Sequence, residues 1–276
     1  MENLEKAQKE TDKRKRKPRE MAIFGNYRNY YGYRVCRDVK EDPRLRVFKR
    51  EWFEGKDCLD IGCNQGILTI NIAKSYCCRS MVGVDIDSFL VENAYWNLKR
   101  MSKRESITRQ SSTVSDSEFS EEVHECGIGS RTVFSGPEKG AVLNDLLERV
   151  SFRKENFVKE LYQESEAYDT ILCLSVTKWI HLNWGDDGLI TLFANIWRLL
   201  RLGGILLLEP QPWKSYKKNY QVSETASLNY RNIQFHPSLF QEILLDKVGF
   251  RMVENITERL PGSAAGFDRP IFVFQK

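Results

Sequence analysis

The chain has 276 residues, of which 41% are hydrophobic and 12% aromatic, so it can bury the core of one large domain or two small ones. A net charge of +4 is too small to give the global positive field typical of a nucleic-acid binder. The seven cysteines make no Cys-x-x-Cys pair, and the three histidines do not have the spacing of zinc ligands. These properties favour a reducing compartment and no metal; because no apolar run reaches about 18 residues, no membrane span is expected.

Residues 1–20 are polar and have no apolar period, so we predict a disordered tail there rather than a secretory signal. Within the tail, KRKRKPR (13–19) is almost entirely cationic. Such a run is either a solubilising tail or an arm for nuclear import or RNA contact, and the two interpretations are compatible. The tail favours a nuclear protein, and a cytoplasmic pool stays open.

Strands and helices alternate along the first half of the chain. DCLDIG (57–62) is a short apolar run that ends in glycine, and ILTINIAKSY (67–76) has helical spacing. SMVGVDI (80–86) is a β-branched run that ends in an acid, and FLVENAYWNLKR (89–100) is amphipathic.

The composition then changes over residues 101–145, where SSTVSDSEFSEE (111–122) is rich in serine and acids. We predict a flexible insertion in one loop here, because the apolar segments on either side need each other to complete one sheet. Residues 21–276 are therefore predicted to form a single domain.

The second half of the chain resumes the alternation. Its predicted elements are the strands RVSFRKENF (149–157) and YDTILCLS (168–175), the helix GLITLFANIWRLLR (188–201), the strand GILLLEP (204–210), the helix PSLFQEILLDKVG (237–249), and the final strands RMVENI (251–256) and RPIFVFQK (269–276). Apolar strands alternating with helices predict an α/β fold with a mostly parallel seven-stranded sheet and helices on both faces. The hairpin-like final pair predicts an antiparallel terminal strand.

The turn DIGCNQG (60–66) predicts a ligand site at the end of the first strand. Asp60, Gly62 and Gly66 belong to a glycine-rich turn that opens a helix, but the turn matches neither GxGxxG nor GxxxxGK[ST]. In GVDID, Asp85 ends the second strand, where an acid can accept both ribose hydroxyls. A glycine turn is often only a turn and such an Asp often only a helix cap, but in this order and spacing they predict an S-adenosylmethionine (SAM) pocket. Asn156 would then read an adenine edge or cap its loop.

From Tyr30 onward the chain resembles the Bin3-type RNA methyltransferases. The motifs that carry the resemblance are YYGYR (30–34), RLRVFKREWFEGKDCLDIGCN (44–64), VGVDIDS (82–88), CLSVTKWIHLNWGDDGL (173–189), LRLGGILLLEPQPWKSY (200–216) and FDRPIFVF (267–274). They run through nearly the whole chain except the tail and the insertion. The resemblance implies a class I, Rossmann-like, SAM-dependent methyltransferase fold.

The resemblance also implies methyl transfer from SAM, with S-adenosylhomocysteine (SAH) as product, to a phosphate oxygen at the 5′ end of RNA. The RNA expected is a small nuclear RNA of the 7SK or U6 kind, methylated on the γ-phosphate of its triphosphate; 5′-monophosphate RNA is the alternative acceptor. Proteins of a ribonucleoprotein are possible partners, and a monomer is expected. A protein that mainly binds and stabilises its RNA, with catalysis secondary, stays open.

The cofactor roles that the resemblance implies fall on residues near the predicted strand ends and the YYGYR segment. They are Tyr33, Arg46, Asn64, Gln65, Gly66, Asp85, Ile86, Asp87, Asn156, Phe157 and Leu174.

The acceptor site is expected after the strand 168–175, since acceptor residues in this fold follow the carboxyl ends of the strands. Lys178 fits a point-charge phosphate ligand, and Arg34 is predicted to fork two oxygens. Tyr30 and Tyr31, like Tyr33, add hydroxyl donors and a wall over the cofactor.

Aromatic and further cationic residues allow two interpretations each. His181, Trp179 and Trp184 either stack on the first nucleotide or pack in the core. The further cationic residues either follow the RNA backbone or form a solvated face. They are Lys214, Lys217, Lys218 and Arg231.

Overall fold

A computed structural model describes residues 22–34, 41–112, 146–159, 161–163, 165–257, 263–264 and 267–276, with only the helical backbone for 104–112. The basic tail and most of the predicted insertion (113–145) lie outside the described residues, so the predictions made for them stay predictions.

The described strands form one seven-stranded sheet in the order β3-β2-β1-β4-β5-β7-β6. The pairs from β3 to β5 are parallel, whereas β7 runs antiparallel to both of its neighbours. This confirms the predicted mostly parallel sheet with an antiparallel terminal strand. The bounds are β1 Asp57–Ile61, β2 Ser80–Asp85, β3 Val150–Lys154, β4 Tyr168–Leu174, β5 Leu200–Glu209, β6 Met252–Thr257 and β7 Ile271–Gln275.

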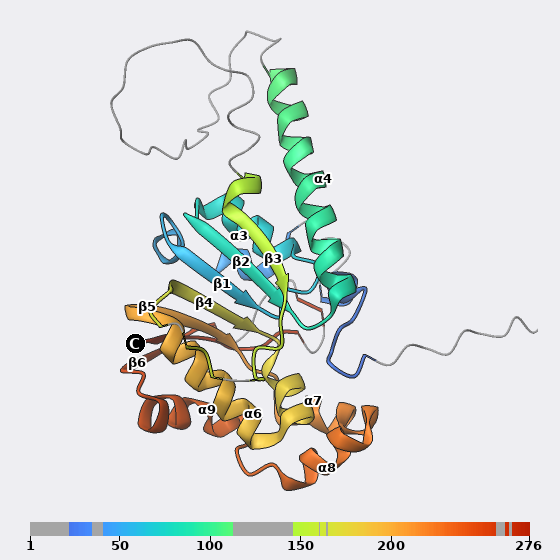
Figure 1. Ribbon diagram of the computed structural model, residues 1–276, viewed down its shortest axis with the longest axis vertical. Coiled ribbons are helices and arrows are strands. Elements are labelled where there is room, and N and C mark those ends of the chain that lie inside the picture. Colours follow the sequence, from blue (N-terminus) through green and yellow to red (C-terminus); the bar gives the residue numbers. More distant parts are fainter. Residues whose placement is uncertain are drawn as a thin grey trace, which may run out of the picture.

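Helices cover both faces of the sheet (Figure 1). The α-helices are α2 Tyr30–Arg34, α3 Ile67–Tyr76, α4 Ser88–Ser112, α6 Thr177–Leu199, α7 Trp213–Asn219, α8 Glu224–Asn232 and α9 Phe240–Glu242. Short 3-10 helices are η1 Pro43–Arg46, η2 Arg50–Trp52, η3 Tyr220–Val222 and η4 Pro237–Leu239, and α9 continues into the π-helix η5 Ile243–Val248.

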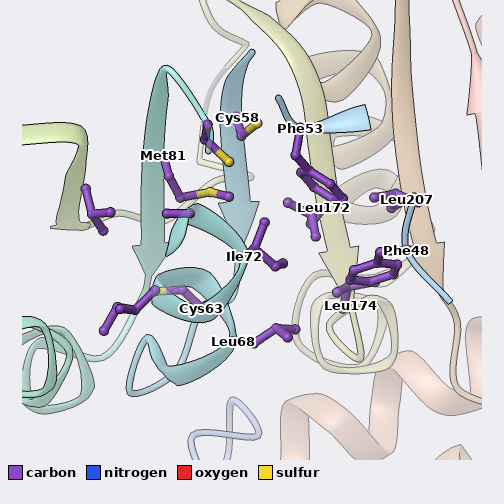
Figure 2. Close-up of a cluster of buried hydrophobic side chains, with 14 of the residues drawn as sticks. Phe48, Phe53, Cys58, Cys63, Leu68, Ile72, Met81, Leu172, Leu174 and Leu207 are labelled. Atoms are coloured by element: carbon purple, nitrogen blue, oxygen red, sulfur yellow. The ribbon is translucent and has the colours of Figure 1, made fainter. Parts of the chain in front are cut away.

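The core has two halves because successive strand residues point to opposite faces. In β4, Leu172 faces the half that includes Phe48 and Phe53 and is covered by α3 and α4 (Figure 2). Ile171 and Cys173 face the half covered by α6, α9 and η5. Runs of apolar residues without alternation are therefore required in the central strands, as the sequence showed.

The strand order places the functional edge between β1 and β4. Helix α3 leaves β1 toward one face and α6 leaves β4 toward the other, so a crevice opens outside their carboxyl ends. The turn at 62–66 and the residue Ser175 lie at this point.

The α-helices differ from the predictions in three ways. Helix α6 begins at Thr177, whereas the sequence predicted a start at 188. The first turns were missed because the buried polar residues Lys178 and His181 interrupt the apolar period and Gly185, at φ 65°, kinks the helix. Helix α4 continues to Ser112, beyond the predicted end at 100. Helices α7 and α8 were not predicted.

The described cysteines differ in state, and the expected reducing compartment stays a prediction. Cys58, Cys63, Cys78 and Cys173 are free and buried, whereas Cys77 is disulfide-bonded. Within the described part of the chain, no helix combines the length and apolar character needed to span a bilayer.

Replacing Leu172 tests the assigned core. Leu172 is fully buried in the central strand β4, so Leu172→Ala is expected to lower the free energy of unfolding by about 2–5 kcal/mol. Urea denaturation followed by circular dichroism measures this change. Leu202→Ala is the matched control, because Leu202 is 70% exposed and its loss should cost less than about 0.5 kcal/mol. Equal effects of the two changes would contradict the assigned core.

Candidate active site

A cleft opens at the carboxyl ends of β1, β2 and β4, with an empty volume of about 730 Å³ including its mouth. Seven of the predicted cofactor residues line it, namely Gly62, Asn64, Asp85, Ile86, Asn156, Phe157 and Leu174. Tyr30, Ser175, Trp179 and Trp184 also line the cleft, together with Phe24, Gly25 and Asn26 from the N-terminal segment.

The turn after β1 is held by its backbone. Gly62, Asn64 and Gly66 all have positive φ, between 52° and 76°, and the N–H groups of Gly62 and Cys63 donate to the carbonyl of Val84. A Cβ on Gly62 would lie 2.3 Å from a methyl group of Val176, so the close packing of that side chain and the positive φ of 76° both favour glycine there. This turn brings the start of α3 against the end of β2.

Asp85 has its carboxylate fixed at the bottom of the cleft. One oxygen accepts from the backbone N–H of Asn64 at 2.9 Å and the other from that of Asp87 at 3.0 Å. Burial nevertheless raises the pKa of Asp85, because these backbone donors only partly offset the loss of solvent. The remaining lone pairs of the carboxylate can accept ligand hydroxyls.

Two polar residues near the cleft accept hydrogen bonds that cap local structure; this alternative was weighed for Asn156 but not for Asp87. Asp87 Oδ1 accepts from the N–H of Phe89 and so caps α4, and Asp87 does not line the cleft. Asn156 Oδ1 accepts from the N–H of Val158 at 3.3 Å while its side chain lines the cleft, which is compatible with both roles.

Residues 22–34, called the strap below, form one wall of the cleft. Asn64 and Gln65 donate side-chain N–H groups to the strap carbonyls of Tyr27 and Arg28 at 3.2 and 2.7 Å. Gly25 lies against the indole of Trp179, where a Cβ would come within 2.1 Å of the ring. The strap therefore binds the glycine turn on one side and α6 on the other.

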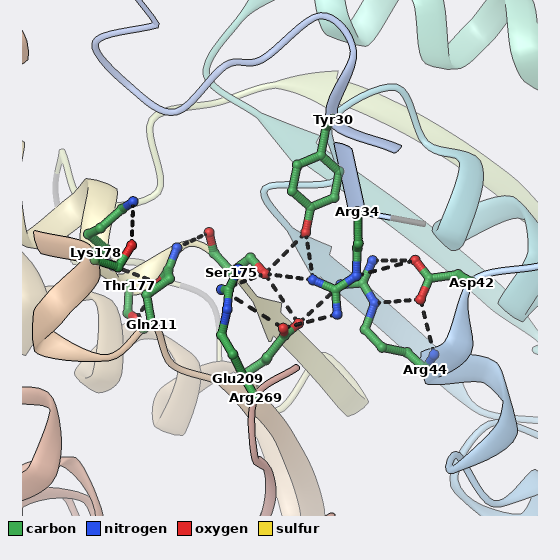
Figure 3. Close-up of polar contacts among 11 residues, drawn as sticks. Tyr30, Arg34, Asp42, Arg44, Ser175, Thr177, Lys178, Glu209, Gln211 and Arg269 are labelled. Atoms are coloured by element: carbon green, nitrogen blue, oxygen red, sulfur yellow. Dashed lines mark hydrogen bonds and ion pairs between the residues drawn. The ribbon is translucent and has the colours of Figure 1, made fainter. Parts of the chain in front are cut away.

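A buried cluster of ions lies where the strap meets the ends of β4 and β5 (Figure 3). Glu209, fully buried, accepts from Arg34 at 3.0 Å and Arg44 at 3.3 Å, and Arg269 lies 3.9 Å away. Arg44 also forks both oxygens of Asp42, at 2.9 and 2.7 Å. Burial alone would raise the pKa of Glu209, but the three guanidinium groups outweigh it and lower that pKa.

Ser175 connects this cluster to the cleft. Its hydroxyl accepts from Tyr30, Arg34 and Arg269 at 3.1–3.2 Å and donates to Glu209 at 3.2 Å. Ser175 has φ 66°, a backbone conformation that turns the chain sharply between β4 and α6. The three arginines and two carboxylates leave one excess positive charge among these five side chains beside the cleft.

Lys178 lies in the first turn of α6, only 5% exposed. Its Nζ donates to Ser215 Oγ at 3.0 Å and Asn219 Oδ1 at 2.7 Å, and it lies 4.1 Å from the ring centre of Trp179. Burial and then the charge of Arg269 lower the pKa of Lys178 to about 7. An incoming phosphate would favour the protonated form and raise that pKa.

His181 is enclosed within the protein. Nε2 lies 2.7 Å from Asp186 and Nδ1 lies 3.3 Å from the hydroxyl of Tyr216, and the side chain is fully buried. Its position fits the packing interpretation rather than a stacked nucleotide. Trp184, by contrast, lines the cleft and stacks on Phe24 at 5.6 Å.

The remaining predicted residues lie around the cleft rather than in it. Tyr31 accepts from the N–H of Leu68, Gly66 caps α3, and Asp60 accepts from Thr69 at 2.6 Å, with a pKa that burial raises to about 6. Tyr33, 52% exposed, and the exposed Arg46 of η1 do not line it. Arg34 is engaged by Glu209 and Ser175, so it holds other groups rather than offering a free fork.

Ser175, Arg269 and Gln211 were not predicted as site residues. Gln211 Oε1 accepts from Thr177 Oγ1 and the N–H of Lys178 at 3.1 Å, and its Nε2 donates to the carbonyl of Ser175. Gln211 belongs to LEPQPW, one of the motifs that carried the family resemblance together with LSVTKW. The sequence therefore pointed to this position but did not predict its hydrogen bonds. The signal for Arg269 was its place in FDRPIFVF.

Comparison with known proteins bears on the identity of this site. The chain is 57% identical to a probable RNA methyltransferase of Arabidopsis thaliana, over 95% of this chain and 83% of the plant protein, and the Bicoid-interacting protein 3 (Bin3) family matches residues 168–276. The chain belongs to the Bin3 family.

Two further members of this group have names that specify an RNA. The U6 snRNA methylphosphate capping enzyme Amus of Drosophila melanogaster is 35% identical over 92% of this chain and 74% of its own length. The human 7SK snRNA methylphosphate capping enzyme is 40% identical over 92% of this chain, and the match spans 39% of the human protein.

The cleft fits a nucleoside-bearing cofactor such as SAM. The buried Oδ1 of Asn64 has no hydrogen-bond partner, and Asp85 next to it offers only acceptors. A ligand with vicinal hydroxyls supplies the donors that these oxygens need, while Phe157 and Leu174 offer apolar walls for a base.

The protonation of Lys178 can be measured directly. NMR titration of protein with 13C-labelled lysine should show one Cε resonance that shifts near pH 7, because burial disfavours the charged form of Lys178. That resonance should be missing from Lys178→Met. A protein in which every lysine resonance shifts only above about pH 10 would contradict the described environment.

Proposed function

We propose that this chain is a SAM-dependent RNA 5′-phosphate methyltransferase that methylates the γ-phosphate of a 5′-triphosphorylated small nuclear RNA. The observation that carries the proposal is the direct contact between a nucleoside-type cleft and a buried cationic cluster, through Tyr30 and Ser175. Membership of the Bin3 family and the names of the fly and human relatives support the RNA acceptor.

A phosphate oxygen is already anionic at neutral pH, so transfer to it requires placement rather than a strong general base. When bound, SAM supplies an electrophilic methyl group on a sulfonium. The protein must hold the phosphate oxygen at about 3 Å from that methyl group and exclude water. The walls formed by the strap and Trp179 exclude water. The cations beside Ser175 hold the phosphate oxygen in place.

Two kinds of cation offset the charge of the acceptor. Lys178 is the movable one, because its partners Ser215 and Asn219 are neutral and can be exchanged for phosphate oxygens. Arg34 and Arg269 are held by Glu209, and both donate to the hydroxyl oxygen of Ser175, which lines the cleft beside Tyr30. The proposed place of the acceptor phosphate is therefore the part of the cleft beside Tyr30 and Ser175.

Action in the nucleus and assembly with ribonucleoprotein proteins belong to the same proposal, because the named relatives modify small nuclear RNAs. A monomer is proposed as the working state.

One RNA prepared with three 5′ ends tests the proposal. With labelled methyl donor, we expect transfer to the triphosphate end, weak or no transfer to the monophosphate end and none to the hydroxyl end. Lys178→Ala should lower transfer at least tenfold while SAH affinity stays near wild type, because Lys178 is not among the residues that line the cleft. Preference for the monophosphate end would favour the alternative acceptor, and transfer to the hydroxyl end would contradict phosphate methylation. Tight retention of RNA without transfer would favour the RNA-binding alternative.

A further inference from the structure

Asn26 lies in the strap, four residues before Tyr30, and its side chain lines the cleft. We propose that Asn26 binds the cofactor, its amide oxygen Oδ1 accepting a hydrogen bond from a ribose hydroxyl. This inference rests on the proposed use of SAM, and it adds a residue from outside the glycine turn and the strand ends.

The orientation of the Asn26 amide follows from its partner. Nδ2 donates to Asp87 Oδ2 at 2.6 Å, and Asp87 Oδ1 accepts from the N–H of Phe89 at 2.9 Å. A carboxylate fixed in this way only accepts hydrogen bonds, so the NH₂ group of Asn26 must face Asp87 and its oxygen must face the opposite way.

The amide oxygen has no donor within the described protein. Oδ1 of Asn26 is buried and unpartnered, as is Oδ1 of Asn64, whose NH₂ group is fixed by the carbonyl of Tyr27 at 3.2 Å. Buried acceptors without donors are unfavourable, so both oxygens favour a ligand that supplies O–H or N–H groups.

The position of these oxygens identifies the ligand group. Asp85, the acid at the end of β2, lies at the ribose position of open α/β sheets, and both Asn26 and Asn64 line the cleft with it. Asp87, which holds Asn26, follows Asp85 by two residues and donates its N–H to the Asp85 carboxylate. Three acceptors thus gather where a ribose offers two vicinal hydroxyls.

The contact also links the methyl donor to the acceptor site. The strap carries Asn26 at one end and, on the short helix α2, Tyr30 and Arg34 at the other. A ribose held by Asn26 therefore stabilises the segment that places Tyr30 in the wall of the cleft.

Isothermal calorimetry with SAH and its 2′-deoxy and 3′-deoxy analogues tests the contact without RNA. Asn26→Ala is expected to weaken SAH binding about five- to tenfold, the effect of one lost hydrogen bond. For the deoxy analogue that lacks the contacted hydroxyl, wild type and Asn26→Ala should bind equally. Each comparison is made within one pair of proteins, so a general change in stability does not mimic it.

Asn183→Ala is the matched control, because Asn183 Nδ2 donates to the strap carbonyl of Ile23 at 3.0 Å but does not line the cleft. Its effect, if any, should be the same for all three ligands. The proposal is overturned if Asn26→Ala leaves SAH affinity unchanged or weakens all three ligands equally. If this binding pattern is found but the protein does not methylate RNA, only the proposed RNA acceptor is contradicted. If the wild type does not bind SAH, both the proposed function and the Asn26 contact are contradicted.

Discussion

The buried carboxylate of Glu209 is the interaction on which the rest of the site depends. It lies at the end of β5 and contacts guanidinium groups from three separate parts of the chain, namely Arg34 of the strap, Arg44 of η1 and Arg269 before β7. Burying these charges is costly, and they are tolerated because each has an opposite charge and directed hydrogen bonds. Removing one partner of such a buried set typically costs about 3–5 kcal/mol.

The sheet determines what this cluster can do. In the β4–β5 ladder, Glu209 pairs with Leu174, and Ser175 donates its N–H to the carbonyl of Glu209. The ions therefore lie at the carboxyl end of β4, next to the switch point where the glycine-rich turn after β1 begins. The proposed donor and acceptor sites are adjacent because β1 and β4 are neighbours in the sheet, although they are far apart in sequence.

The sequence was informative where one short segment contains the whole signal. The strands, the turn at Gly62 and the strand-end acid Asp85 were all predicted, because apolar runs and glycine turns are local patterns. The start of α6 was missed, since buried polar side chains such as His181 break the apolar period.

Residues whose role depends on distant partners could not be predicted. Arg34 was expected to fork a phosphate, but its partner Glu209 is 175 residues away and only the folded sheet brings them together. Arg269 and Asn26 likewise carry no local signal, because their partners are distant in sequence. Arg269 donates to the hydroxyl of Ser175, and Asn26 donates to the carboxylate of Asp87.

Hydrogen exchange of a Glu209→Gln variant tests most directly whether this carboxylate holds the site together. The change keeps the shape of the side chain but leaves Arg34, Arg44 and Arg269 with Asp42 as the one remaining carboxylate of the cluster. We expect amides of the strap, such as that of Tyr33, and of η1 to exchange much faster than in the wild type, while amides of β1 and β2 keep their protection. Wild-type protection of the strap in Glu209→Gln would contradict the account.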